Sequence, residues 1–297
     1  VYLFYQSKLL QQPFIKIASR SWTLRSGVAE SDDKPVCVQP VEVFSNQRKV
    51  KLLVNGNLLD EVEAIDGIAT FNVPFIKGTN TLEAITSSST MSYKDYIEVN
   101  FLMIPPNLRS ANIPFKEINI SLGDPRYFID EKLQQVWLPE KAYEKGGWGY
   151  IGGTVFTMKG NTRQSFGSNK NILGTDYDPI YETERTGIES FKLDVPDGKY
   201  EVTLLFAELL SNKERETLVY NLGDSTAKED TRERTFDVII NRQKVIEDLS
   251  NTRELVPETA YAEKFETEVR NNTGIVIEFI KKKGETILNG VQVRKIY

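Results

Sequence analysis

The chain contains no histidine among its 297 residues and a single cysteine, Cys37. The first absence excludes Ser-His-Asp and Cys-His catalysis as well as histidine-ligated metal centres. The second excludes any disulfide within the chain. Basic residues are in the minority, and a net charge of −5 provides no basic surface for nucleic acid or an anionic membrane. The sequence also lacks a phosphate-binding glycine loop and an apolar run long enough to span a membrane.

What the sequence does contain is alternation of apolar and polar residues with a period of two, which is typical of β-strands. The first residues differ: a helical pattern ends at Pro13, and we interpret residues 1–34 as a helix and a connector. Alternating segments follow over 35–105 and include Asn55-Gly56, a two-residue hairpin signal. Short strands at this spacing predict a small antiparallel β-sandwich over 35–105.

Prolines interrupt the alternation near the middle of the chain. Pro105, Pro106 and Pro114 predict a stiff linker over residues 106–116. The alternation then resumes, and its clearest apolar positions are Phe191, Leu193, Val195, Tyr200, Val202, Leu204 and Phe206. The sequence thus predicts an all-β fold whose second, larger β-sandwich covers 117–297 and is of the jelly-roll type.

Aromatic side chains, glycines and acids gather in residues 147–185. Trp148 and Tyr150 lie in a glycine-rich run, and the candidate contacts that follow are Tyr177, Asp178, Tyr181, Glu182 and Arg185. Flat rings supply apolar contact area, and carboxylates and a guanidinium form directed hydrogen bonds to hydroxyls. This combination suits a sugar. The alternative is structural: the rings close one end of a sandwich, and Arg185 forms an ion pair.

Two carboxylate pairs, Asp176/Asp178 and Glu182/Glu184, are the enzymatic candidates, because glycoside hydrolysis needs an acid together with a base or nucleophile. In an extended segment such i, i+2 pairs point the same way and serve more often as hydrogen-bond acceptors. We therefore predict no catalytic residue in this chain. The loop around Asp176 and Asp178 could hold structural calcium, but two acids do not define a site of about six to eight ligands. We predict neither a metal nor a cofactor.

Several motifs of the second half occur in the order found in malectin-like carbohydrate-binding domains. They are Asp178–Arg185, Val195–Val202, Phe206–Glu208, Arg234–Val238 and Leu288–Val293. The chain resembles that family over roughly residues 116–297, which implies a galactose-binding-like jelly roll that binds carbohydrate with loops at one end. Two aromatics of the malectin site are replaced by Thr186 and Leu209, and the connection 212–234 is longer than in malectin. We expect Tyr220 in this connection to replace a lost contact.

The first half resembles the region after the catalytic barrel in family 2 glycoside hydrolases of the β-galactosidase kind. Residues 2–7 are similar to the last barrel helix, and Val43–Asn46 and Leu52–Gly56 to the immunoglobulin-like domain after it. Together the two resemblances imply the C-terminal accessory region of a larger glycosidase, with the catalytic glutamates on the barrel. The implied partners are carbohydrate and that barrel, and the implied location is periplasmic or extracellular.

The function that follows from these patterns is non-catalytic. We expect the two domains to brace the barrel and to hold glycan near it, because a tethered binding module raises the local concentration of substrate. The competing interpretation is purely structural, with both sandwiches acting as spacers or subunit contacts without sugar binding. An autonomous hydrolase is the least favoured alternative.

Overall fold

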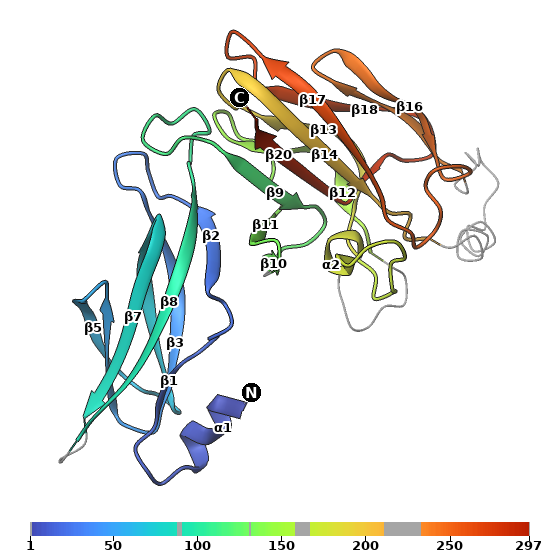
Figure 1. Ribbon diagram of the computed structural model, residues 1–297. Coiled ribbons are helices and arrows are strands. Elements are labelled where there is room, and N and C mark those ends of the chain that lie inside the picture. Colours follow the sequence, from blue (N-terminus) through green and yellow to red (C-terminus); the bar gives the residue numbers. More distant parts are fainter. Residues whose placement is uncertain (1, 88–90, 131, 158–166, 211–232, 297) are drawn as a thin grey trace. The chain divides into compact units, whose positions relative to one another are not determined.

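The computed structural model describes residues 2–87, 91–130, 132–157, 167–210 and 233–296, and the predicted all-β fold is confirmed. The chain divides into two compact units, Val1–Pro106 and Asn107–Tyr297 (Figure 1). In the described residues, each unit has one short helix, α1 (Tyr2–Leu9) in the first and α2 (Asp178–Tyr181) in the second. No helix of the described ranges is long and apolar enough to cross a membrane.

The described part of the first unit forms a three-stranded and a five-stranded sheet. The smaller has the order β1 (Ile15–Ile17), β3 (Val36–Ser45), β6 (Ile68–Ile76). The larger has the order β2 (Leu24–Val28), β8 (Ser92–Ile104), β7 (Gly78–Ser87), β4 (Lys49–Val54), β5 (Asn57–Glu63). β1 and β2 lie before residue 35, where the sequence pattern placed the first strand. β2 shows no alternation because its first four residues are all buried, and it pairs with β8 in parallel.

Alternating burial explains the predicted strands of this unit. In β4, Val50, Leu52 and Val54 are buried, while Lys49 and Lys51 are exposed and Leu53 is half-buried. At its end Asn55 and Gly56 have φ values of 52° and 79°, the left-handed conformation that a two-residue hairpin turn requires. The hairpin joins β4 to β5 in antiparallel register. The prediction from Asn55-Gly56 is therefore confirmed.

The second unit has two six-stranded sheets in its described part. One has the order β10 (Phe128–Asp130), β11 (Gln135–Pro139), β9 (Glu117–Ser121), β20 (Gly290–Lys295), β14 (Gly198–Phe206), β17 (Tyr261–Val269). The other has the order β12 (Trp148–Val155), β13 (Arg185–Leu193), β18 (Ile275–Lys283), β15 (Thr235–Ile240), β16 (Gln243–Ser250), and β19 (Ile287–Leu288) also pairs with β13.

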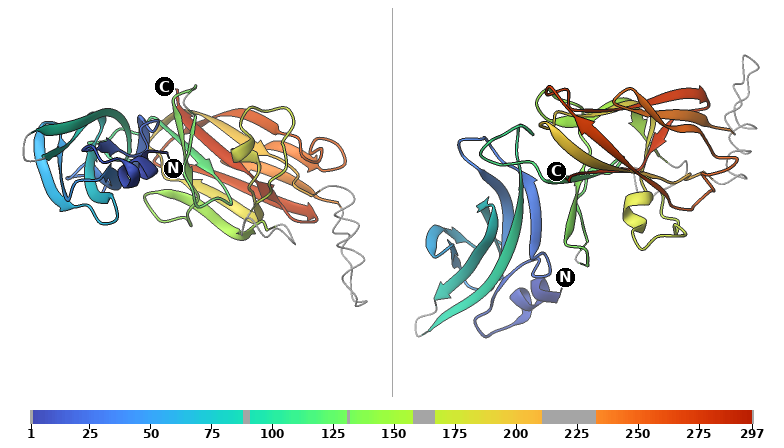
Figure 2. Two further views of the ribbon diagram at one scale, coloured as in Figure 1. Left: turned by 90° about the horizontal axis from the view of Figure 1, so that it is seen from below. Right: turned by 45° about the horizontal axis from the view of Figure 1, so that its top comes forward.

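The core of the second unit lies between its two sheets, which Figure 2 shows from two further directions. Val202, Leu204 and Phe206 of β14 are fully buried, as are Phe236 and Val238 of β15. The ring centroids of Phe206 and Phe236 lie 6.2 Å apart and connect one sheet to the other. The alternation predicted for these strands is confirmed, and it arises because every second side chain faces the opposite sheet.

Residues 107–116 pack on the second unit. Leu108, Ile113 and Phe115 are buried, and the Phe115 ring lies 6.1 Å from that of Tyr200 on β14. The amide of Leu108 also donates a hydrogen bond to the carbonyl oxygen of Gly146. The stretch interpreted as a linker over 106–116 thus contributes apolar side chains to the second sandwich.

We predict that a fragment 107–297 unfolds cooperatively and that a shorter fragment 117–297 is much less stable. The shorter fragment lacks Leu108, Ile113 and Phe115, and burying each such side chain stabilises a fold by about 1.5–3 kcal/mol. Urea denaturation should show a free energy of unfolding lower by roughly 5 kcal/mol. Equal stability of the two fragments would show that 107–116 is only a linker.

Candidate functional site

One buried amide, that of Asn289, holds together the loops at one end of the second unit. Its Nδ2 donates hydrogen bonds to the carbonyl oxygens of Tyr181 (3.1 Å) and Thr183 (2.8 Å). Its Oδ1 accepts one from the backbone amide of Ala207 (2.7 Å), and its own backbone amide donates to Leu205 (2.9 Å). The side chain is fully buried. Asn289 therefore fixes the end of α2 against the end of β14.

The Arg185 side chain is committed to contacts within the protein. Its Nε and one terminal nitrogen donate to the two carboxylate oxygens of Glu140, at 2.8 and 2.6 Å, and the other terminal nitrogen donates to the carbonyl oxygen of Gly153 at 2.8 Å. The guanidinium also lies 3.3 Å from the centroid of the Tyr150 ring. Both partners of the ion pair are buried. This is the structural ion pair that was the alternative to a sugar contact.

A second buried ion pair joins Glu208, after β14, to Arg234, before β15. The Arg234 Nε donates to a Glu208 oxygen at 2.7 Å, and the Asn251 amide donates to the same oxygen at 3.3 Å. Glu208 is fully buried, and Arg234 also donates to the carbonyl oxygen of Glu285. Two segments far apart in the sequence are thereby held by charge-assisted hydrogen bonds.

Glu184 is a buried acid near this pair. Its Oε1 accepts a hydrogen bond from the Thr186 hydroxyl at 3.0 Å, and its Oε2 is enclosed without a partner. Burial raises the pKa of Glu184 to about 8, Glu208 adds to the shift, and Arg234 opposes it. The carboxyl group is therefore mostly protonated in the folded protein at neutral pH, since one guanidinium cannot compensate two buried carboxylates.

A hollow of about 380 Å³ opens beside the loop that leads into α2. Its lining comes from β10, from the turn after it and from that loop, and consists of Phe128, Ile129, Asp130, Lys132, Asp176 and Tyr177. The lining combines two aromatic rings with two carboxylates and an ammonium group. Such a mixture of apolar ring faces and hydrogen-bonding groups suits a polar ligand with apolar patches.

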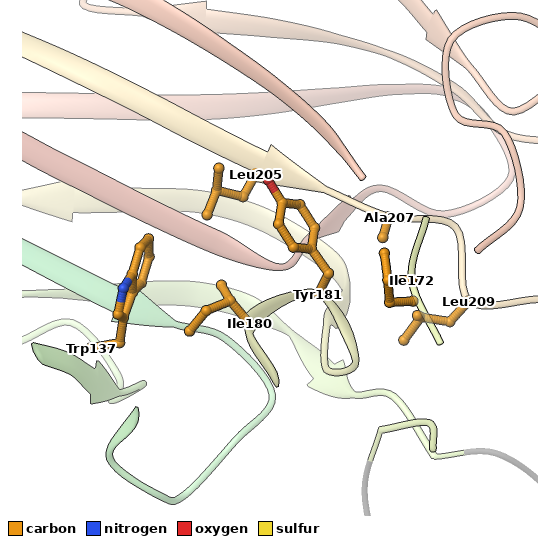
Figure 3. Close-up of a cluster of buried hydrophobic side chains, with 7 residues drawn as sticks. All are labelled: Trp137, Ile172, Ile180, Tyr181, Leu205, Ala207 and Leu209. Atoms are coloured by element: carbon orange, nitrogen blue, oxygen red, sulfur yellow. The ribbon is translucent and has the colours of Figure 1, made fainter. Parts of the chain in front are cut away.

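Tyr177 lines the hollow and also contacts a cluster of buried apolar side chains. Its ring packs against a buried cluster that Figure 3 shows, formed by Trp137, Ile172, Ile180, Tyr181, Leu205, Ala207 and Leu209. Its hydroxyl is close enough to the Asp130 carboxylate for the two groups to shift each other's pKa. Partial burial and Asp130 together raise the pKa of Tyr177 to about 12. The hydroxyl is therefore neutral at physiological pH.

Acids also surround the start and end of α2. Burial raises the pKa of Glu182, and the nearby carboxylates of Asp178 and Asp124 raise it further, whereas Arg126 opposes the shift. Arg126 forms an ion pair with Asp124 at 2.9 Å. In the described residues no group of three or more acids or cysteines has the geometry to hold a metal ion.

The residues predicted to bind sugar lie in different places. Tyr177 lines the hollow, and Asp178 and Glu182 flank α2 next to it. Tyr150 stacks on Arg185, away from the hollow's lining. Trp148 and Tyr181 are buried, with 3% and 5% of their surface exposed, so neither ring is open to solvent. The candidate contact Tyr220 falls outside the described residues.

The residues on the β10 side of the hollow were not predicted from the sequence. Phe128 and Asp130 lie on β10, which pairs with β11 in antiparallel register at the edge of the sheet, and Lys132 follows in the turn after it. The only signal in the sequence is the short run Tyr127-Phe128-Ile129-Asp130, in which aromatic, apolar and acidic residues are adjacent. That run resembles an ordinary strand end, and alternation alone does not reveal which distant loop it meets.

The malectin domain family matches residues 127–293, more than half of the chain. The chain therefore belongs to the malectin domain family. In the first unit, residues 37–90 match a domain of unknown function, DUF4982. None of the curated proteins compared matches the chain.

Among solved structures, the chain is similar over its whole length to β-glucuronidase from Bacteroides uniformis, with 30% identity and a TM-score of 0.83. The same values hold for B. uniformis β-glucuronidase 2 covalently bound to cyclophellitol-6-carboxylate aziridine, and a calcium-binding mutant of that enzyme gives 30% and 0.84. The chain spans 32% of the length of each of these proteins. The predicted resemblance to the C-terminal accessory region of a family 2 glycoside hydrolase is thus confirmed.

We predict that Asn289→Ala destabilises the chain by about 3 kcal/mol or more, because three buried backbone groups lose their partner and each costs about 1–3 kcal/mol. Urea denaturation of the full chain measures the loss. The matched control is Asn57→Ala, whose amide is exposed; it should change stability by less than about 0.5 kcal/mol. A loss of similar size in both variants would contradict the central role of Asn289.

A further prediction concerns pH. Because the folded-state pKa of Glu184 lies above its unfolded value of 4.5, the folded protein keeps a proton that the unfolded chain loses. This contribution to stability is complete below about pH 4.5 and is lost as the pH rises towards 8, by up to about 1.4 kcal/mol per unit. Glu184→Gln should therefore become more stable than the wild type as the pH rises from 5 to 8.

Thermal unfolding in buffers across that range provides the measurement, with Glu189→Gln as control, because Glu189 lies exposed on β13, the strand that begins directly after Glu184. A constant difference between Glu184→Gln and wild type at every pH would show that Glu184 is charged in the folded state.

Proposed function

We propose that this chain is a non-catalytic, carbohydrate-binding part of a glycoside hydrolase. Membership of the malectin domain family supports carbohydrate binding. The similarity to B. uniformis β-glucuronidase over the whole chain supports a glycoside hydrolase as the parent protein. A tethered binding module of this kind increases the time that the enzyme spends near its substrate, without any chemistry of its own.

The observation that carries the binding proposal is the hollow around Tyr177. The rings of Phe128 and Tyr177 line the hollow, and aromatic rings of this kind can stack on the C–H side of a sugar ring. Asp176 is exposed and can accept hydrogen bonds from sugar hydroxyls, and Lys132 can donate to them. Tyr177 is held in place from behind by the buried cluster, so the site is partly pre-formed.

Burial of the acids supports the non-catalytic part of the proposal. Glu184 and Glu208, which belong to the family motifs, are 1% and 0% exposed. Glu208 is engaged by Arg234, and Glu140 by Arg185. A glycosidic bond cannot reach carboxyl groups in these positions, and glycoside hydrolysis requires two that flank the bond.

The first unit has a surface suited to the bracing role. Tyr2, Tyr5 and Leu9 lie on one face of α1 by their spacing, and all three are more than half exposed. An exposed apolar stripe of this kind favours contact with another protein surface, which we propose to be the catalytic domain of the parent enzyme. The same exposed stripe would also serve the alternative role, in which the two domains act as a spacer or a subunit contact.

As part of a glycoside hydrolase, the chain is proposed to be periplasmic or extracellular.

The binding proposal predicts that a glycan found by array screening loses affinity when the hollow is altered. Truncating a central stacking aromatic costs about 2 kcal/mol, or roughly 30-fold in affinity, so Tyr177→Ala should weaken binding by that factor in calorimetry. Asp176→Asn tests the polar side of the hollow and should weaken binding less. Tyr96→Ala is the control, because Tyr96 is 49% exposed in the first unit.

Each variant must first show a melting temperature close to that of the wild type. A broad glycan screen without a hit would favour the spacer interpretation. A hit whose affinity is unchanged by Tyr177→Ala and Asp176→Asn would move the site elsewhere on the chain.

A further inference from the structure

The hollow beside α2 carries charges of both signs on two walls. One wall, formed by β10 and the turn after it, contributes Asp130 and Lys132, and the other, the loop before α2, contributes Asp176. The apolar part of the lining consists of Phe128, Ile129 and Tyr177. Its volume of about 380 Å³ lies at the small end of the range for ligand sites, about 300–1,000 Å³, and suits a single sugar ring.

The carboxylate of Asp130 is engaged within the protein. It is buried and accepts a hydrogen bond from the amide of Leu133 at 2.9 Å. Burial disfavours its charge, yet the pKa of Asp130 is lowered, because the Leu133 amide and the Tyr177 hydroxyl donate hydrogen bonds to the carboxylate. Asp176 and Lys132, which are both exposed, therefore face a ligand as one charge of each sign.

One charge of each sign favours a neutral ligand with a strong dipole. A sugar carboxylate in the hollow would meet the Asp176 carboxylate, and a sugar ammonium group would meet the Lys132 ammonium group. Like charges at such short range repel each other. A neutral group gains from both walls when it presents a donor to the carboxylate and an acceptor to the ammonium group.

We propose that the hollow selects sugars that carry an acetamido group, the class of 2-acetamido-hexoses; this inference rests on the proposed binding of carbohydrate at the hollow. A secondary amide is planar and trans, so its N–H and C=O point in opposite directions. The N–H suits the Asp176 carboxylate, and the carbonyl oxygen suits the Lys132 ammonium group. The methyl group suits the apolar lining of Phe128 and Ile129, and the sugar ring stacks on Tyr177.

A plain hexose uses the hollow less completely. Its hydroxyls can donate to Asp176 and accept from Lys132, but it has no methyl group to cover the side chains of Phe128 and Ile129. Burial of the methyl group, together with an amide aligned between two charged partners, favours the acetamido sugar by roughly tenfold or more. An acetylated lysine side chain has the same amide and methyl group, but it has no ring to stack on Tyr177.

The test uses the full chain with N-acetylglucosamine and N-acetylgalactosamine as probes. Glucose, glucosamine, glucuronate and Nε-acetyl-lysine are the comparison ligands, each of which lacks one feature of the probes or adds a charge. Calorimetry at millimolar ligand concentration gives the affinities. We expect saturable binding of at least one N-acetylhexosamine that is roughly tenfold tighter than that of any comparison ligand.

Variants of the two walls test the assignment of the amide. Asp176→Asn and Lys132→Met should each weaken binding of the N-acetylhexosamine by roughly tenfold, because each removes one charged partner of the amide. Both side chains are exposed, so the melting temperature should stay near that of the wild type. The matched control is Lys199→Met, which removes an exposed lysine at the start of β14, outside the lining, and should leave the affinity unchanged.

Absence of saturable binding of both N-acetylhexosamines overturns the proposal, as does equal affinity for glucose. Binding that survives both Asp176→Asn and Lys132→Met overturns it as well. Nε-acetyl-lysine that binds as tightly as the sugar would assign the hollow to an acetylated protein and contradict the proposal.

These outcomes are distinct from failure of the proposed function. Another glycan that loses affinity in Tyr177→Ala would leave carbohydrate binding at the hollow in place and remove only the preference for the acetamido group. A glycan screen without any hit would remove both.

Discussion

The hydrogen bonds of Asn289 are the constraint on which the loop end of the second unit depends. The fully buried amide joins the backbone after α2 to the backbone at the end of β14, at distances between 2.7 and 3.1 Å. All three partners are backbone groups that would otherwise be unsatisfied inside the protein, so each loop can form only together with the other. Tyr177 immediately precedes α2, and the position of its ring at the hollow therefore follows from this network.

The charged residues of the family motifs serve the fold. Arg185 with Glu140 and Arg234 with Glu208 are buried pairs that join segments distant in sequence, and Glu184 is enclosed beside the second pair. Removing one member of such a pair leaves an uncompensated charge in the interior, which typically costs about 3–5 kcal/mol. These charged residues of the family motifs are therefore needed for the fold of the second unit, and they are not exposed for contact with a ligand.

The strands were predictable from the sequence because burial on one face imposes a period of two, as in Val202, Leu204 and Phe206. β2 was not, since a strand buried on both faces has no such period. Of the candidate site, Tyr177 was predictable, because in the sequence this aromatic residue stands between two acids, Asp176 and Asp178. The burial of Trp148 and Tyr181 could not, because the same aromatic residue serves a core or a surface depending on contacts between distant segments. Phe128 and Asp130 were missed for the same reason: they lie on the edge strand β10, and only the fold brings this strand to the loop before α2.

We propose that the second unit binds carbohydrate at the hollow between β10 and the loop before α2. The most direct measurement is an NMR titration of the full chain with a glycan that binds, with backbone assignments for this region. We expect the largest chemical-shift changes on residues 128–130, 132 and 176–177, with little change at Trp148 and Tyr150 on β12. Shift changes concentrated on β12 and β13, or absent from the hollow, would contradict it.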